Sequence, residues 1–379
     1  MKINYTWMKI NYTWMKINYT RMKIILLSAF MIFSGAGNCP QDAFRGGQCI
    51  VSSEFIYQPS DVNFPSCHAS TICQTREGLL AAWFGGTSEG NPDVAIWTSR
   101  FINGRWTKPE EAANGVQHKN KRYPCWNPVL YNLGDTVLLF YKVGPSPSTW
   151  WGEVKYSCDN GKSWSVSRRL PEDILGPVKN KPVKLKNGEL LCPSSSENDG
   201  WRLHIEFTSD RAITWERTPF LNDKDIYAIQ PSVLFHPGSL QLLCRTKQLK
   251  IYTAWSKDNG RQWTELMPLC LPNPDAGIDA LTLANGKSLV VYNHLSSGRH
   301  ILNVAVSENG TEWKAVALLE NGHQGSEYSY PAVIQTDDGL VHITYTWERK
   351  LIKHVVIDPE KASALPMLNG IWPEEHINK

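Results

Sequence analysis

The chain has 379 residues, of which 20% are charged, and its formal net charge is only +3. Lys and Arg are spread along the chain rather than clustered, so the charge pattern does not favour a nucleic-acid-binding protein. The 16 Trp and 14 Tyr residues are enough for a large hydrophobic core, and the repeats described below favour one closed domain over two separate ones.

Two segments precede the expected domain. Residues 1–21 are three near-identical polar heptads, which are too short and too polar to form a fold. Residues 22–39 have the layout of a secretion signal, because Lys23 precedes an apolar run that is followed by small residues and is too short to span a membrane. The sequence therefore predicts a secreted or periplasmic protein without a transmembrane helix, and Cys39 offers the alternative of lipid attachment.

A polar turn recurs along the chain at intervals of about 50 residues. The sequence SCDNGKSW at 157–164 returns as SKDNGRQW at 256–263, and more loosely at 209–215 and 307–313. Asp and Asn tolerate unusual backbone angles and Gly supplies a positive φ, so each copy predicts a tight turn between two strands. This spacing is typical of the blades of a β-propeller.

Six apolar strand pairs, each joined by a Gly-containing turn, follow one another in the sequence. They are expected at 70–84, 127–141, 181–192, 230–244, 279–292 and 330–345. We therefore predict an all-β fold, a six-bladed β-propeller over residues 50–358. Strand-like sequence near residues 49–57 is expected to close the ring with the last blade, and residues 359–379 are expected to form a polar tail.

The innermost strands of a propeller converge on one axis, so the side chains at their starts should surround a shared site. The residues at these starts are polar or aromatic: His68, Trp126, Asn127, Asn180, Lys181, Gln230, Asp279, Glu327, Tyr328, Ser329 and Tyr330. Sugar binding requires aromatic faces together with a few fixed donors and acceptors. We therefore expect a glycan as the partner. Trp150 and Trp151, in a Pro/Ser-rich connection, are expected either to form a sugar-stacking rim or to pack the blade edge.

The recurring turns and the blade pattern resemble the BNR or aspartate-box repeats of the sialidase (neuraminidase) superfamily over residues 50–358. The resemblance implies a glycoside hydrolase with a tyrosine nucleophile, an acid, and three arginines that bind the substrate carboxylate. Tyr328 matches the nucleophile, Glu89 matches the acid, and Arg245 matches one arginine.

Three family positions depart from the pattern. His68 stands where the first arginine is expected, Gln230 stands where a glutamate is expected, and no arginine lies near residues 277–279. One guanidinium cannot reproduce the planar contacts of three. The resemblance therefore implies an exo-glycosidase that removes a terminal, acidic sugar other than ordinary sialic acid.

The candidate residues can be grouped by role. The catalytic candidates are Glu89, Tyr328 and His68, and the substrate-binding candidates are Arg245, Gln230, Asn127, Trp126, Lys181, Asp279 and Tyr330. Further cations that could face the axis are Lys181, His204, Arg349 and Lys353.

Two alternative functions stay open. In a polysaccharide lyase, His68 or Tyr328 would take the proton α to a uronate carboxylate, with Arg245 neutralising the carboxylate. In a carbohydrate-binding propeller no bond would be cleaved. The amide of Gln230 cannot accept the proton of a tyrosine nucleophile, and this keeps the binding alternative open.

The nine cysteines include no CxxC pair, and no metal or other cofactor is predicted. Cys67, Cys125, Cys192 and Cys244 lie beside or within apolar strand-like runs and are interpreted as small buried hydrophobic residues. The sequence does not define the oligomeric state.

Overall fold

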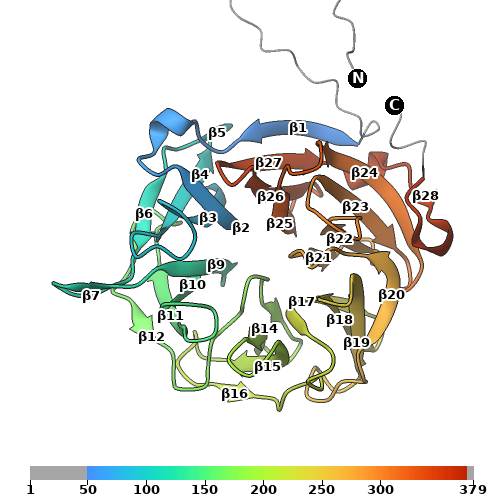
Figure 1. Ribbon diagram of the computed structural model, residues 1–379, viewed down its shortest axis with the longest axis horizontal. Helices are drawn as coiled ribbons and strands as arrows, with labels where there is room; N and C mark the ends of the chain where they lie inside the picture. Colours follow the sequence, from blue (N-terminus) through green and yellow to red (C-terminus); the bar gives the residue numbers. More distant parts are fainter. Residues whose placement is uncertain (1–48, 374–379) are drawn as a thin grey trace, which may run out of the picture. The chain divides into compact units, whose positions relative to one another are not determined.

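The computed structural model describes residues 49–373. The heptads and the leader with Cys39 lie outside the described residues. The described part is all-β, and six sheets surround a common axis with β2, β9, β17, β21 and β25 nearest the middle (Figure 1). The predicted six-bladed β-propeller is therefore confirmed.

The first three blades follow one another along the chain. Blade one contains β2 (Ser66–Thr75), β3 (Gly78–Gly86), β4 (Ala95–Ile102), β5 (Arg105–Trp106) and β6 (Glu110–Ala113). Blade two contains β9 (Cys125–Asn132), β10 (Val137–Val143), β11 (Trp151–Ser157) and β12 (Arg168–Arg169). Blade three contains β13 (Val183–Lys184), β14 (Leu190–Ser196), β15 (Arg202–Thr208) and β16 (Glu216–Arg217).

The other three blades complete the ring. Blade four contains β17 (Ala228–His236), β18 (Ser239–Thr246), β19 (Lys250–Ser256) and β20 (Met267–Pro272). Blade five contains β21 (Asp279–Thr282), β22 (Ser288–Tyr292), β23 (Ile301–Ser307), β24 (Trp313–Asn321) and β28 (Leu365–Pro366). Blade six contains β25 (Tyr328–Gln335), β26 (Val341–Trp347), β27 (Leu351–Ile357) and β1 (Ile50–Phe55).

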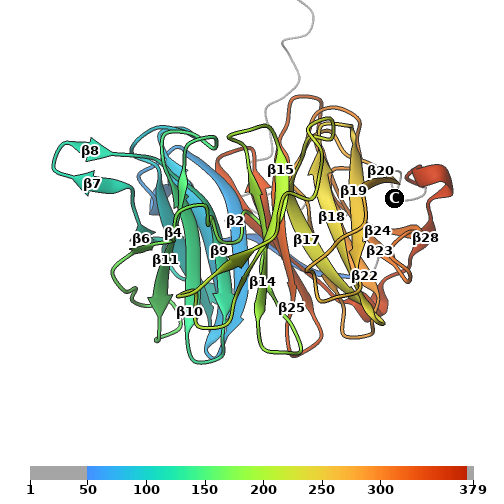
Figure 2. The ribbon, with the colours of Figure 1, turned by 90° about the horizontal axis from the view of Figure 1, so that it is seen from below.

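A few short elements lie outside the blades. A two-stranded hairpin of β7 (Val116–His118) and β8 (Lys121–Arg122) projects from the ring (Figure 2). Three single-turn 3-10 segments are η1 (Pro59–Asp61), η2 (Pro359–Lys361) and η3 (Leu368–Gly370). No helix in residues 49–373 is long and apolar enough to cross a membrane.

Strands from the two ends of the propeller sequence meet in the closing blade. β1 pairs antiparallel with β27, with Glu54 opposite His354, as the sequence predicts for ring closure. Part of the segment expected to be a polar tail is instead a strand of blade five, because β28 pairs with β24 with Lys314 opposite Pro366.

The recurring turns have the hydrogen bonds that their residues favour. In the copy that follows β11, Gly161 N donates to Ser157 Oγ at 2.8 Å and Ser163 N donates to Asp159 Oδ1 at 2.9 Å. The φ of Gly161 is +84°, and a Cβ at this position would lie 2.7 Å from Leu80 of blade one. Glycine is therefore required both for the turn and for the contact with the preceding blade.

Packing between neighbouring sheets forms the core. One cluster joins blades one and two through residues such as Leu80 and Leu139, and similar clusters fill the other junctions around the ring. The four cysteines interpreted as buried hydrophobic residues are each at most 1% exposed, which confirms that interpretation. The eight cysteines within the described range are all free thiols.

Candidate functional site

A residue with left-handed backbone interrupts the inner strand of four blades. Ala69 in β2, Asn127 in β9, Gln230 in β17 and Tyr330 in β25 have φ values between +36° and +56°. At each of them the pairing with the next strand shifts register. A bulge of this kind re-aims a side chain, and it costs a non-glycine residue about 1 kcal/mol or more. Its repetition shows that side-chain direction matters at the starts of these strands.

Tyr330 is the centre of the cluster that these bulges form. Its Oη accepts hydrogen bonds from Arg245 Nη1 at 2.6 Å and from Gln230 Nε2 at 3.4 Å. Arg245 Nη1 also donates to Gln230 Oε1 at 3.1 Å, and Arg245 Nε donates to Asp275 Oδ1 at 2.8 Å. Arg245 and Gln230 are both buried, so this part of the site is fixed by its own hydrogen bonds.

Two further arginines reach the same cluster from blades five and six. Arg299, in the connection between β22 and β23, lies 5.8 Å from the centre of the Tyr330 ring, and its Nη2 donates to Asp275 O at 3.0 Å. Arg349, in the turn between β26 and β27, donates from Nε to Glu327 Oε2 at 2.9 Å. Glu327 Oε1 accepts from Arg299 Nη1 at 3.2 Å, so one carboxylate joins the two guanidiniums. We call Arg245, Arg299 and Arg349 the arginine cluster.

The Glu327 carboxylate is held in its charged form. Burial by itself would raise the pKa of Glu327, but the hydrogen bond and charge of Arg349, the hydroxyl of Ser329 and the charge of Arg299 together lower it. Glu327 therefore remains the anionic bridge of the cluster at neutral pH.

His68 lies against Tyr330, with the two ring centres 4.1 Å apart. Its Nδ1 is 2.9 Å from Thr346 Oγ1, and its buried Nε2 has no hydrogen-bond partner among the described residues. Burial first, and then the charges of Arg349 and Arg299, lower the pKa of His68 well below its ordinary value. The imidazole is therefore neutral at pH 7 and cannot replace a guanidinium.

A guanidinium nevertheless lies beside the strand that carries His68. Cys67 N donates to Arg349 O at 2.8 Å, so the turn of blade six that carries Arg349 runs next to β2. Sequence reasoning named Arg349 only among the further cations that could face the axis, and it did not name Arg299. Both arginines lie in connections between outer strands, whereas sequence reasoning considered the starts of the inner strands. Lys353, another of those cations, instead donates from Nζ to Glu320 Oε1 at 2.6 Å.

Tyr328 and Tyr330 have different surroundings, although residues two apart on a regular strand share a face. Tyr328 is 7% exposed and belongs to the core that joins blades five and six, with its ring 6.2 Å from that of Trp347. Burial raises the pKa of Tyr328. The bulge at Tyr330 separates the two, so the structure brings Tyr330 rather than Tyr328 to Arg245 and Gln230.

Glu89 and Trp126 lie near the cluster on the side of blades one and two. Glu89, in the loop between β3 and β4, accepts a hydrogen bond from Arg349 Nη1 at 2.5 Å, and its side chain is 41% exposed. Trp126 donates from Nε1 to Gly144 O at 2.9 Å. Asn127 is buried at the bulge of β9.

Lys181 and Asp279 bind each other and tie the inner strands together. Lys181 Nζ lies 2.9 Å from Asp279 Oδ2. Asp279 also accepts from Ser232 Oγ at 3.0 Å and from Val333 N at 2.9 Å. This carboxylate therefore connects blades three, four, five and six, and its oxygens are occupied by the protein itself.

Lys179 extends this network across the axis. Its Nζ donates to Ile278 O of blade five and to Pro331 O of blade six. Burial lowers the pKa of Lys179 to about 7, an effect that Asp279 opposes. We call Lys179, Lys181 and Asp279 the axial network. Sequence reasoning missed Lys179, which precedes the expected strand start at Lys181.

Within residues 49–373, no three His, Cys, Asp or Glu side chains are grouped so that they could hold a metal ion. Carboxylates near the arginine cluster instead face guanidiniums.

The family of the chain is decided by a match over most of the propeller. The model of the BNR repeat-like domain matches residues 77–343. The chain belongs to the BNR repeat-like domain family. A search of curated proteins found no match to this BNR repeat-like chain.

Solved structures share the fold at low sequence identity. A protein of unknown function from Dyadobacter fermentans is 18% identical with a TM-score of 0.64, over 81% of this chain and 98% of that one. The Hadza microbial sialidase Hz136 is 16% identical with a TM-score of 0.70, over 82% and 69%. The intramolecular trans-sialidase from Ruminococcus gnavus, in complex with oseltamivir carboxylate, is 14% identical with a TM-score of 0.66, over 85% and 100%. This BNR-family propeller is therefore sialidase-like in fold.

Proposed function

We propose that the protein is an exo-acting glycoside hydrolase that binds a terminal sugar through its carboxylate and releases that sugar from a glycan. The observation that carries the proposal is the convergence of three arginines from three different blades. Arg245 and Arg299 lie over the ring of Tyr330, and Arg349 is joined to Arg299 through Glu327. Guanidinium groups bind carboxylates through paired, planar hydrogen bonds. Several arginines around one aromatic residue therefore suit an acidic sugar.

Donor atoms remain for such a ligand. Among the described residues, Arg245 uses Nε and Nη1 and Arg349 uses Nε and Nη1, so each keeps Nη2 for a further partner. The side chains of Arg299 and Arg349 are 23% and 31% exposed. A substrate carboxylate can thus reach them without breaking the bonds that hold Arg245.

In the proposed reaction Tyr330 Oη attacks the anomeric carbon while Glu89, in its protonated form, gives its proton to the departing glycosidic oxygen. The Glu89 carboxylate then takes a proton from the water that attacks the anomeric carbon, and Tyr330 leaves as a phenolate that regains a proton from solvent. The hydrogen bond from Arg245 stabilises negative charge on the phenol oxygen. Gln230 donates to that oxygen and so cannot take its proton. The phenol proton passes to water, because no carboxylate contacts Tyr330 Oη within the described residues.

The same Gln230 contact favours a second candidate, a propeller that binds acidic glycans without cleaving them. Tyrosine is a weak nucleophile unless a base activates it. Binding and cleavage therefore need separate measurements.

The test combines titration calorimetry with turnover of aryl glycosides of sialic acid and of glucuronic acid. Arg299→Ala should weaken binding of the matching free acid at least tenfold, and Arg211→Ala, which changes an exposed arginine paired with Asp135, should not. Gln230→Glu should raise turnover, because a carboxylate can accept the phenol proton.

Binding without turnover in every variant would select the second candidate. Equal affinity for the acids and for neutral sugars would contradict both. An ultraviolet-absorbing unsaturated product formed from an unlabelled uronate-containing oligosaccharide would indicate a lyase.

We also propose that residues 22–39 direct export of the chain. Expression with this segment should place the protein outside the cytoplasm with a new N-terminus close to Cys39, as read by N-terminal sequencing. Retention of the intact leader in the cytoplasm would contradict export.

A further inference from the structure

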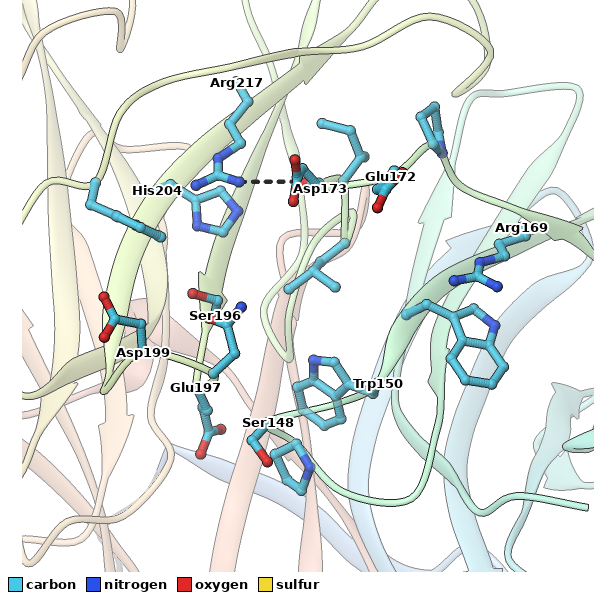
Figure 3. Close-up of a pocket in the computed structure, with 17 residues that line it drawn as sticks. Ser148, Trp150, Arg169, Glu172, Asp173, Ser196, Glu197, Asp199, His204 and Arg217 are labelled. Carbon is cyan, nitrogen blue, oxygen red and sulfur yellow. Dashed lines mark hydrogen bonds between the residues drawn. The ribbon is translucent and has the colours of Figure 1, made fainter.

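A cavity of about 490 Å³ opens between blades two and three (Figure 3). Its volume falls in the range of small-molecule sites, roughly 300–1,000 Å³. Its walls are the connection before β11, the segment that follows β12, and the end of β14 with the loop after it. We call it the inter-blade cavity, and the mechanism proposed above does not use it.

Three buried polar atoms that have no hydrogen-bond partner within residues 49–373 belong to side chains that line this cavity: Trp150 Nε1, Ser196 Oγ and His204 Nδ1. Trp150 is 9% exposed and His204 is fully buried. Buried polar groups in native proteins are nearly always hydrogen-bonded, and each exception calls for an explanation. A polar ligand in the cavity would supply the missing partners.

A hydrogen bond to Glu206 holds the His204 ring in one orientation. Its Nε2 lies 2.8 Å from Glu206 Oε1. Because a carboxylate only accepts, Nε2 carries the hydrogen and Nδ1 is left as an acceptor. Glu206 also accepts from Leu175 N at 2.9 Å and from Gly176 N at 2.6 Å. The same carboxylate therefore fixes both His204 and the segment that forms another wall.

The lining suits a neutral sugar better than an acidic one. Four carboxylates line the cavity: Glu172, Asp173, Glu197 and Asp199. They outnumber its two arginines, Arg169, which lies 4.7 Å from the centre of the Trp151 ring, and Arg217, which donates to Asp173 O at 3.2 Å. Carboxylates accept hydrogen bonds from hydroxyl groups, while an indole N–H donates one. Aromatic side chains offer apolar faces to the C–H groups of a pyranose.

The cavity adjoins the arginine cluster through one side chain. Glu197 lines the cavity, and it also interacts with Trp201 and with the charge of Arg245. The ring of Trp201 lies 4.8 Å from the guanidinium of Arg245. Glu197 therefore lies between the cavity and Arg245.

We propose that the inter-blade cavity is a second saccharide subsite, which binds a neutral pyranose unit of the glycan whose acidic terminal sugar occupies the arginine cluster. The link between the two sugars rests on the proposed function, whereas binding of the neutral sugar depends only on the cavity. Trp150 donates to a hydroxyl of this sugar, and His204 accepts from another.

The test measures binding of three neutral disaccharides, lactose, cellobiose and maltose, to the full chain by saturation-transfer NMR and calorimetry. At least one should bind in the millimolar range. Trp150→Phe, which keeps an aromatic ring but removes the N–H, should weaken that binding roughly three- to tenfold. Ser196→Ala, a smaller change, should weaken it by a similar factor and guards against misfolding of the tryptophan variant.

A matched control separates this proposal from the proposed function. Arg299→Ala should leave neutral disaccharide binding unchanged while it removes binding of the acidic sugar. If acidic sugars fail to bind and the neutral disaccharide still binds through Trp150, the second subsite stands and the proposed function falls. If none of the three disaccharides binds at 20 mM, or if both cavity variants bind as the unchanged protein does, the second subsite is wrong.

Discussion

The arginine cluster and the axial network are both built from charged side chains of several blades, but they differ in how those charges are satisfied. Lys179 and Asp279 are 3% and 2% exposed, and the Asp279 carboxylate accepts from Lys181, Ser232 and Val333. Arg299 and Arg349 keep about a quarter to a third of their side chains exposed. Charges that the protein fully satisfies stabilise the ring, whereas charges with donors left over are available to a ligand.

The largest effect is expected when the axial network loses its anion. Asp279→Ala leaves Lys181 partly buried without its carboxylate, and removing one member of a buried pair costs about 3–5 kcal/mol. Urea denaturation should show that loss in the free energy of unfolding. Asp258→Ala, in an exposed turn of blade four where Asp258 accepts from Arg261 N and Gln262 N, is the control and should cost about 1 kcal/mol. Equal losses in the two variants would contradict the structural role of Asp279.

A smaller effect, on binding rather than on stability, is expected in the arginine cluster. Arg245→Lys keeps the charge but removes the planar fork, so affinity for an acidic sugar should fall about 10- to 100-fold. Thermal unfolding should change by only a few degrees, because Asp275 is partly exposed. If Arg245→Lys lowers the stability but keeps the affinity for the acidic sugar, the arginine cluster has the structural role that we assign to the axial network.

Titration of Lys179 gives an effect of intermediate size. Burial lowers the pKa of Lys179 to about 7, whereas an unfolded lysine titrates near 10.4. Between these values the unfolded state binds more protons, so the free energy of unfolding rises with pH, by about 1.5 kcal/mol from pH 7 to 8.5. Lys179→Met should reduce that rise in urea titrations at the two pH values. An identical rise in both proteins would contradict the lowered pKa.

The smallest effect, on the pH dependence of stability, is expected at His68, which is neutral and lies near the charged side chains of the arginine cluster. Its lowered pKa means that the unfolded state takes up a proton below about pH 6.5 while the folded state does not. The free energy of unfolding should therefore fall on acidification from pH 6.5 to 5.5. His68→Gln should reduce that fall by about 1 kcal/mol, as measured by urea denaturation at the two pH values. A steeper fall in the variant would contradict a neutral His68.

The fold could be predicted because its signals are local. The turn sequence SCDNGKSW specifies its own hydrogen bonds, and its spacing specifies a blade. The site could be predicted only in part, because it depends on where bulges and turns direct side chains. Tyr328 and Tyr330 look equivalent in sequence until the left-handed φ at Tyr330 separates them. Arg349 comes close to His68 only through the pairing of blade six with blade one.

Closure through β1 has a consequence for how the molecule is made. The partner of Ile50–Phe55 is β27, which ends at Ile357. Among the described strands, the first to be synthesised therefore waits for nearly the last. Contacts between such distant segments slow folding. During this delay the edges of β1 and β27 are both open to association with other chains. Such a chain is expected to need protection from a chaperone until synthesis is complete.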